Sequence, residues 1–411
     1  MARRNIGTPR FYCDIPSYLK SIGKYHGSNE SNIDGSNAGE EKVWNMNPYQ
    51  PNSYTLGSAK TNSGIRFWIN QEPTGTSNQV HIEDPELHKL LSYINSADGH
   101  HSTGWYGGIL GHNIASLQSQ TGYNISIGQR FIGRPSNLTN PHYANPNAFD
   151  EIVNFESGSL LSEATGWGVA KYDGYSLWEI TERGSVDDVF RYNMIDFTLI
   201  NADDDQVWGE NAELKVGAYT TGIFFEPPHS PDLQVKLSLE SKGVNVSETV
   251  GGNTLVNIDY LGVPNWGDQP AWTLQKTEGR DYTTMANRAR RVWSLSFSYI
   301  SDDNLFDKAN NANKFFNDSF NDGDENAHKP ANFDTSMSSF FKLTQNGALP
   351  FIFCPDSKAT RTETTLVEGV DVEVEVPDLE FATCILDQNS IVATQVAFQT
   401  WNISMVVREV W

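Results

Sequence analysis

The sequence contains side chains that could bind a metal or hydrolyse a substrate, but their spacing fits neither kind of chemistry. An acidic run fails as a calcium loop, because aligning Gly323 as the sixth residue places Lys329 where the twelfth position needs a carboxylate. Five histidines occur at irregular intervals, whereas a metal site needs ligands that converge with defined geometry: His81, His88, His100, His101 and His112. Common nucleophile, phosphate-loop and zinc-protease motifs are absent, and no pair of carboxylates stands out. These residues indicate no metal site, no cofactor site and no particular catalytic residue.

Aromatic side chains near residues 155–178 suggest a different chemistry, the binding of sugars. The segment contains FESG followed by TGW, a phrase with which jelly-roll carbohydrate modules often begin. Four aromatic residues could form a platform for a sugar ring: Trp167, Tyr172, Tyr175 and Trp178. The same residues would fill the core if they alternate inward, because buried aromatics supply much of a β core. Sugar binding and internal packing both remain open at this point.

Composition limits the compartment and the partners. A formal net charge of −22 argues against nucleic acid, since phosphate contacts need a basic face. The cysteines Cys13, Cys354 and Cys384 show no CxxC spacing, which indicates buried free thiols in a reducing compartment. Neither a signal peptide nor a membrane-length apolar window is evident. We expect a soluble protein, made in a cytoplasm, that binds no nucleic acid and inserts into no membrane.

These candidate residues must be positioned by strands, because β-forming patterns dominate the sequence. Abundant aromatics and short alternating segments separated by turn residues predict an all-β-dominated fold, an antiparallel β-sandwich or jelly roll with a few short helices and long loops. Residues 233–240 alternate cleanly and predict a half-buried strand, with these side chains facing inward: Leu233, Val235, Leu237 and Leu239. Three prolines lie just before this segment: Pro227, Pro228 and Pro231. Because they have no backbone N–H to donate to a neighbouring strand, they must precede the strand or lie at a sheet edge.

Two further strands alternate in the same way. Residues 290–301 predict a strand with these side chains facing inward: Trp293, Leu295, Phe297 and Tyr299. The segment ending in REVW predicts a paired strand with these residues on one face: Trp401, Ile403, Met405 and Val407.

The pattern changes near residue 149 and predicts two regions. Residues 1–148 read as an irregular N-terminal arm and loop region with one helix at about 84–96. Residues 149–411 read as the β-sandwich, with a helical insertion at about 303–346 and an acidic hairpin at about 366–378. We expect that removing residues 1–60 leaves the sandwich folded but prevents assembly.

Several phrases of the second region occur in a characteristic order. They are PHSPDL, PNWGDQPAW, RRVWSLSFSYIS, GALPFIFCPD and a closing QVAFQTWNISMVVREVW. In this order the chain resembles a family of virion structural proteins from tailed bacteriophages, chiefly of marine bacteria, and more loosely it is similar to distal tail proteins. The matching positions include Arg291, Trp293, Pro350, Phe351 and Phe353, whereas Cys354 departs from the polar residue expected there.

The resemblance implies a structural protein of a phage virion that acts by subunit assembly in the tail or baseplate region, without a catalytic site. We therefore predict that the protein is not an enzyme. It implies synthesis in the host bacterial cytoplasm and a final location in the virion tail. The partners would be copies of the chain in a symmetric ring or array, together with other virion proteins. The alternative is a carbohydrate-binding module that recognises a host surface glycan through the aromatic segment. A depolymerising enzyme with a pair of carboxylates is kept as the last of the three hypotheses.

Overall fold

The structure is a computed structural model that describes part of the chain. The described residues are 7–21, 28–31, 46, 52–55, 65–68, 105–122, 125–132, 168–169, 174–180, 192–199, 212–233, 235–240, 244–248, 251, 254–258, 265–266, 269–270, 290–306, 337–367, 370–377, 381–387 and 390–410. The helix expected at about 84–96, most of the insertion expected at about 303–346, Trp167 and Tyr172 lie outside these residues.

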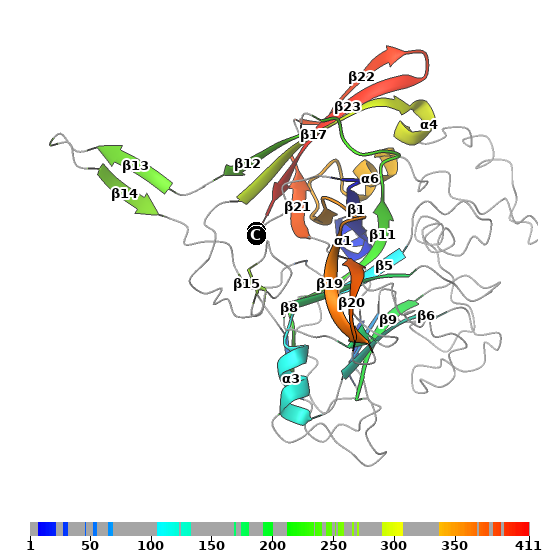
Figure 1. The fold of residues 1–411 in the computed structure, drawn as a ribbon, viewed down its shortest axis with the longest axis vertical. Helices are drawn as coiled ribbons and strands as arrows, with labels where there is room; N and C mark the ends of the chain where they lie inside the picture. Colours follow the sequence, from blue (N-terminus) through cyan, green and yellow to red (C-terminus); the bar gives the residue numbers. More distant parts are fainter. Residues whose placement is uncertain are drawn as a thin grey trace, which may run out of the picture.

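One ten-stranded antiparallel sheet organises the described residues (Figure 1). Nine strands follow one another in this spatial order: β12 (Lys236–Glu240), β17 (Arg290–Ser301), β23 (Thr400–Glu409), β21 (Ala382–Leu386), β18 (Phe351–Cys354), β1 (Arg10–Asp14), β11 (Ala218–Phe225), β5 (Trp105–His112) and β8 (Gly174–Ile180). The tenth strand, β22 (Val392–Ala397), pairs with β23. The prediction of a mostly β, antiparallel fold with few short helices is confirmed.

Smaller ribbons accompany this sheet. They are β2 (Ser28–Ser31) with β4 (Ile65–Trp68), β3 (Asn52–Thr55) with β10 (Glu213–Val216), β13 (Val244–Glu248) with β14 (Thr254–Ile258), β15 (Asn265–Trp266) with β16 (Gln269–Pro270), β19 (Thr360–Val367) with β20 (Val370–Pro377), and β6 (Ile125–Ile132) between β7 (Gly168–Val169) and β9 (Tyr192–Leu199). The β19–β20 ribbon occupies the region where the sequence predicts an acidic hairpin. The helices are α1 (Ile15–Ser21), α3 (Ile114–Thr121), α4 (Asp302–Leu305) and α6 (Met337–Leu343).

Strand β1 lies inside the large sheet, between β18 and β11. Its Phe11 side chain is fully buried, and its ring centroid lies 4.8 Å from that of Phe340 in α6 and 5.2 Å from that of Phe353 in β18. Aromatic rings at such separations attract one another beyond the effect of burial alone. The sheet therefore joins segments from both sides of residue 149, and the first described residues form part of its core.

A bulge in β17 changes the direction of one predicted core residue. Phe297 faces Ile403 and Ile300 faces Trp401, so Ser298 and Tyr299 together oppose only Asn402. A bulge of this kind re-aims the side chains that follow it. Trp293, Leu295 and Phe297 are buried as predicted, but Tyr299 is 78% exposed and Ile300 is buried in its place. The inward prediction for Tyr299 was therefore wrong.

The segment with the three prolines, called the proline corner below, precedes an edge strand, as expected for residues that lack a backbone N–H. Pro227, Pro228 and Pro231 lie before β12, which pairs with β17 at the end of the sheet. Leu233 lies before the strand begins and is fully exposed, so its predicted inward direction was wrong. Leu237 of β12 is 39% exposed, so its inward prediction was also wrong. By contrast, Val235 packs against the core.

Candidate functional site

Three of the phrases on which the family resemblance depends supply strands of the large sheet, namely β17, β18 and β23. Arg291 of β17 and Glu409 of β23 form an ion pair in which Nε and Nη2 donate to the two carboxylate oxygens at 3.2 and 3.0 Å. The backbone N–H of Arg291 also donates to Glu409. The side chains of the pair are only 3% and 1% exposed. Two positions more than a hundred residues apart in sequence thus form one buried polar contact.

Neighbouring motif residues pack around this ion pair. The Arg291 guanidinium lies 5.0 Å from the ring centroid of Trp293, and the Trp293 ring meets Phe353 edge-on at 5.1 Å. Phe351 is buried beside them in β18, and Pro350, just before that strand, is half-buried. Arg291, Trp293, Phe351 and Phe353 therefore stabilise the sheet.

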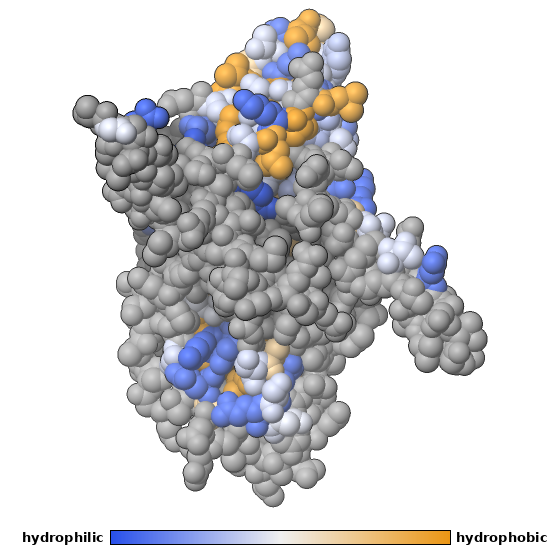
Figure 2. Space-filling model, turned by 60° about the vertical axis from the view of Figure 1, so that its left-hand side comes forward, coloured by the Kyte–Doolittle hydropathy of each residue, from blue (hydrophilic) through white to orange (hydrophobic). Residues whose placement is uncertain are grey.

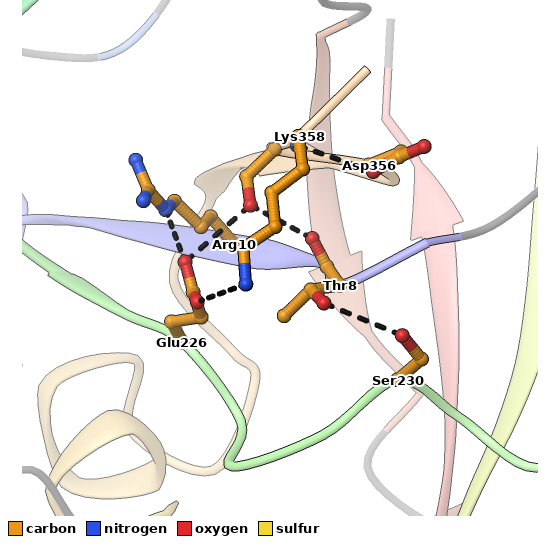
Figure 3. Close-up of polar contacts among 7 residues, drawn as sticks. Thr8, Arg10, Glu226, Ser230, Asp356 and Lys358 are labelled. Atoms are coloured by element: carbon orange, nitrogen blue, oxygen red, sulfur yellow. Dashed lines mark hydrogen bonds and ion pairs between the residues drawn. The ribbon is translucent and has the colours of Figure 1, made fainter.

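A second polar cluster fastens the proline corner (Figure 3). Glu226, directly after β11, accepts a hydrogen bond from Arg10 Nε, and its other oxygen lies 3.8 Å from Lys358 Nζ. Ser357 donates its backbone N–H to the Thr8 carbonyl at 2.9 Å, and the Thr8 and Ser230 hydroxyl oxygens lie 3.3 Å apart. These contacts join the segment before β1, the corner and the loop after β18. Their geometry fixes the direction in which the chain enters β12.

Asp14 is a buried polar residue that the sequence analysis did not identify. One of its carboxylate oxygens accepts the backbone N–H of Ser17 at 2.9 Å, as the N-cap of α1 does. The other accepts the Thr220 hydroxyl at 2.9 Å, and that hydroxyl also lies 2.8 Å from the Tyr106 hydroxyl. Burial raises the pKa of Asp14 from 3.8 to about 6, although its hydrogen bonds act in the opposite direction. Asp14 directly precedes a short helix that has Pro16 near its start. An Asp followed by an early Pro is a sequence signal for the N-cap of a helix, and this signal could have identified Asp14.

The candidate metal and redox residues within the described part of the chain have structural surroundings. His112 is buried; its Nδ1 accepts the Ile114 N–H at 3.3 Å, and its Nε2 lies 2.9 Å from the Ser176 hydroxyl. The three cysteines are buried free thiols, as predicted. Burial, followed by the nearby Glu409 charge, raises the pKa of Cys384.

The described residues contain neither a cluster of metal ligands nor a helix that could span a membrane. Among them, no group of three or more His, Cys, Asp or Glu side chains is arranged to hold a metal ion. Within the same part of the chain, no helix is long and apolar enough to cross a bilayer.

Of the four aromatic residues considered for sugar binding, the structure describes the side chain of one. Trp178 is 1% exposed and belongs to the hydrophobic core. Tyr175 lies in β8, but its side chain is outside the described set. The burial of Trp178 favours the packing interpretation at this position.

The most distinctive exposed surface lies at the β22–β23 hairpin, which extends beyond the rest of the large sheet (Figure 1). Apolar side chains gather at the same end of the molecule in the space-filling view (Figure 2). Val392 and Val396 of β22 are 52% and 46% exposed, and Phe398 in the turn is 86% exposed. Together with Tyr299 and Phe306, these residues are called the apolar tip below.

Both faces of the hairpin contribute to the apolar tip. The Phe306 ring meets that of Trp401 edge-on at 5.1 Å, and the indole N–H of Trp401 donates to Asp302 at 2.7 Å. On the next residue of β23, Asn402 accepts the backbone N–H of Tyr299 at 3.1 Å. Consecutive side chains of a strand point to opposite faces, so Phe306 and Tyr299 lie beside opposite sides of the hairpin. The sequence did not predict this surface, because Tyr299 was expected to face inward and the alternation in residues 392–398 was not interpreted.

Comparisons with protein-family models, curated proteins and solved structures found no match to this chain. The candidate site therefore rests on the geometry above.

Proposed function

We propose that this protein is a structural component of a tailed-phage virion and acts by subunit assembly in the tail or baseplate region. The apolar tip is the observation that carries the proposal. Contiguous exposed apolar residues on a folded protein mark surfaces that bind other proteins or membranes. Strands β22 and β23 belong to the ten-stranded sheet, which fixes the backbone of the hairpin. The exposed side chains of the hairpin therefore present a defined shape to a partner.

The packing of the motif residues also supports a structural role. Trp293 contacts both Arg291 and Phe353, and Phe351 is buried in the same sheet. Glu226 holds the proline corner through its ion pair with Arg10. Prolines at compatible positions reduce the entropy of the unfolded chain and so stabilise the corner. A subunit that is copied in an assembly benefits from such a rigid frame. We include in the proposal that the large sheet belongs to a β-sandwich or jelly roll.

The proposal makes partners of further copies of the chain, in a ring or array, and of other virion proteins. It assigns no enzymatic activity to the chain. The alternative, a carbohydrate-binding module, gains no support from Trp178, whose ring is buried. A glycan array with the purified protein and its Trp167→Ala variant tests that alternative directly.

The location of the chain in purified particles tests the main proposal. Antibodies raised against the recombinant protein would be applied to gradient-purified particles of the phage that encodes it, with an antibody to a head protein as the control. We expect labelling at the tail and a matching peptide signal by mass spectrometry. Particles that lack the chain in both measurements would overturn the proposal.

A further inference from the structure

One edge of strand β22 has no partner strand among the described residues, and the arrangement of β21, β18 and β23 shows why. Strands β21 and β22 lie consecutively along the same side of β23: Leu386 pairs with Val407, and Val392 pairs with Ser404. The far side of β21 is covered by β18. Within the described residues, β22 pairs with β23 alone. Strand β18 covers β21 but ends before β22, so the edge of β22 that faces away from β23 has no described partner strand there.

The register identifies the backbone groups on this open edge. The Val406 carbonyl accepts the Asp387 N–H at 2.9 Å, and the Val406 N–H donates to the Ser390 hydroxyl oxygen at 2.9 Å, so the backbone groups of Val406 face the β21–β22 side. Backbone direction alternates along a strand, and Ser404 and Asn402 therefore face the same side. Their partners Val392 and Thr394 point inward to β23. Ala393 and Gln395 consequently direct their backbone N–H and C=O groups away from the sheet.

Among the described residues, β22 keeps one of the usual protections of an edge strand, a bulge in its second half, and lacks the others. Natural proteins block such edges with charged residues, prolines, bulges or covering segments. Residues 388–407 contain no Asp, Glu, Lys, Arg or Pro, and every residue of β22 is exposed. A bulge occurs near Gln395 and Ala397, beyond the first half of the strand. An uncharged and uncovered edge of this kind is a template for pairing with another strand.

We propose that the open edge of β22 pairs antiparallel with β22 of a second copy of this chain. This inference rests on the proposed function and names the first contact of the assembly. A twofold axis at Thr394 places Ala393 of each copy opposite Gln395 of the other, so the outward N–H and C=O groups of both copies satisfy one another. Such a contact is isologous and needs no second type of surface.

The net charge of the chain opposes contact between two copies over most of the surface, and the uncharged hairpin is where this repulsion is weakest. Each copy carries a formal net charge of −22, so most approaches between two copies bring like charges together. The uncharged hairpin offers an approach without that repulsion, and the valines and Phe398 of the apolar tip add buried apolar area on contact. A strongly basic partner would instead be recognised by acidic surfaces elsewhere.

A pair of variants at one position tests the proposal. Gln395→Pro removes an outward N–H without removing a ladder bond to β23, whereas Gln395→Thr keeps the N–H and favours a strand. Sedimentation equilibrium should show a concentration-dependent dimer of the 45.9 kDa wild-type chain and of Gln395→Thr. We expect Gln395→Pro to weaken self-association by about tenfold or more, because it leaves a buried acceptor unpaired. A monomeric wild type, or equal association of the three proteins, would overturn the proposal.

Hydrogen exchange of the wild type provides a second measurement that does not depend on the folding of a variant. Peptides covering residues 390–399 should gain protection as the protein concentration rises, while those covering β19 and β20 should not change. Exchange that is independent of concentration in the hairpin would contradict the β22 contact. If the chain is found in particle tails while this contact fails, the virion function stands and only the self-pairing of β22 is rejected.

Discussion

Arg291 and Glu409 form a buried two-point ion pair that joins β17 to β23. The pair lies where four strands come together, because Arg291 faces Leu239 of β12 and Glu409 faces Cys384 of β21. The sequence places these charges in the phrases RRVW and REVW, which lie more than a hundred residues apart. Their contact gives a physical reason why both phrases occur in the same chain.

Removing one member of this pair should destabilise the fold severely. Arg291→Met leaves the Glu409 carboxylate buried without its partner, and such losses lower the free energy of unfolding by about 3–5 kcal/mol. Urea unfolding followed by tryptophan fluorescence measures the change. The double variant Arg291→Met, Glu409→Leu serves as the control and should recover much of the loss. A single variant as stable as the wild type would contradict the role of the pair.

Phe11 should contribute as much to stability as any residue of the core, although it lies near the start of the chain. Phe11→Ala opens a cavity among the rings of Phe340, Phe351 and Phe353, and this type of change costs about 3–5 kcal/mol. Thermal unfolding by calorimetry checks the prediction. The exposed Leu233→Ala change is the matched control and should alter stability little.

The position of β1 also changes the expectation for a larger deletion. From the sequence alone, residues 1–60 are expected to be removable without unfolding the rest. Removing them takes away a strand that pairs with both β11 and β18, so we now expect the truncated chain to lose its cooperative unfolding transition. A truncated protein with wild-type near-ultraviolet circular dichroism would show that β1 is dispensable.

Asp14 should make stability depend on pH between about 4 and 6. Its pKa rises from 3.8 to about 6 on folding, so in this window the folded protein holds a proton that the unfolded chain has released. Raising the pH therefore lowers the free energy of unfolding, by roughly 3 kcal/mol for a shift of about two units. Urea unfolding of wild type and Asp14→Asn at several pH values isolates this contribution. The variant should gain stability relative to wild type as the pH rises, and a constant difference would refute the assignment.

Tyr299 combines a strained backbone with an exposed ring. Its φ is 62°, a left-handed conformation that is unfavourable for a bulky side chain. Tyr299→Gly should therefore leave the free energy of unfolding unchanged or raise it by about 1 kcal/mol, despite the loss of an aromatic ring. Chemical denaturation measures this effect. A loss of more than about 1 kcal/mol would indicate that the ring stabilises the folded subunit instead of serving a partner.

Local patterns predicted the strands of the second region well. In β23, Ile403, Met405 and Val407 are buried on one face as predicted, because alternation reports directly on a strand with one covered side. The three prolines also precede an edge strand, since a residue without an N–H has few other places in a sheet.

The errors arise from features that single strands do not encode. The bulge in β17 depends on the register with β23, so Tyr299 could not be separated from the inward residues before it. The open edge of β22 depends on the short length of β18, which lies elsewhere in the sequence. Strand β1 was read as part of an arm because its long-range partners at residues 218–225 and 351–354 are invisible to local periodicity.

The strand order delays completion of the sheet during synthesis. Strand β1 emerges early but waits for β11 and β18, and β23 must enter between β17 and β21. Contacts between distant segments form slowly, because long loops must close first. Until residues 400–409 leave the ribosome, β17 and β21 lack their shared neighbour and the apolar tip has not formed. Under the proposed assembly, a nascent chain could not join its partners through the apolar tip before its own sheet is complete.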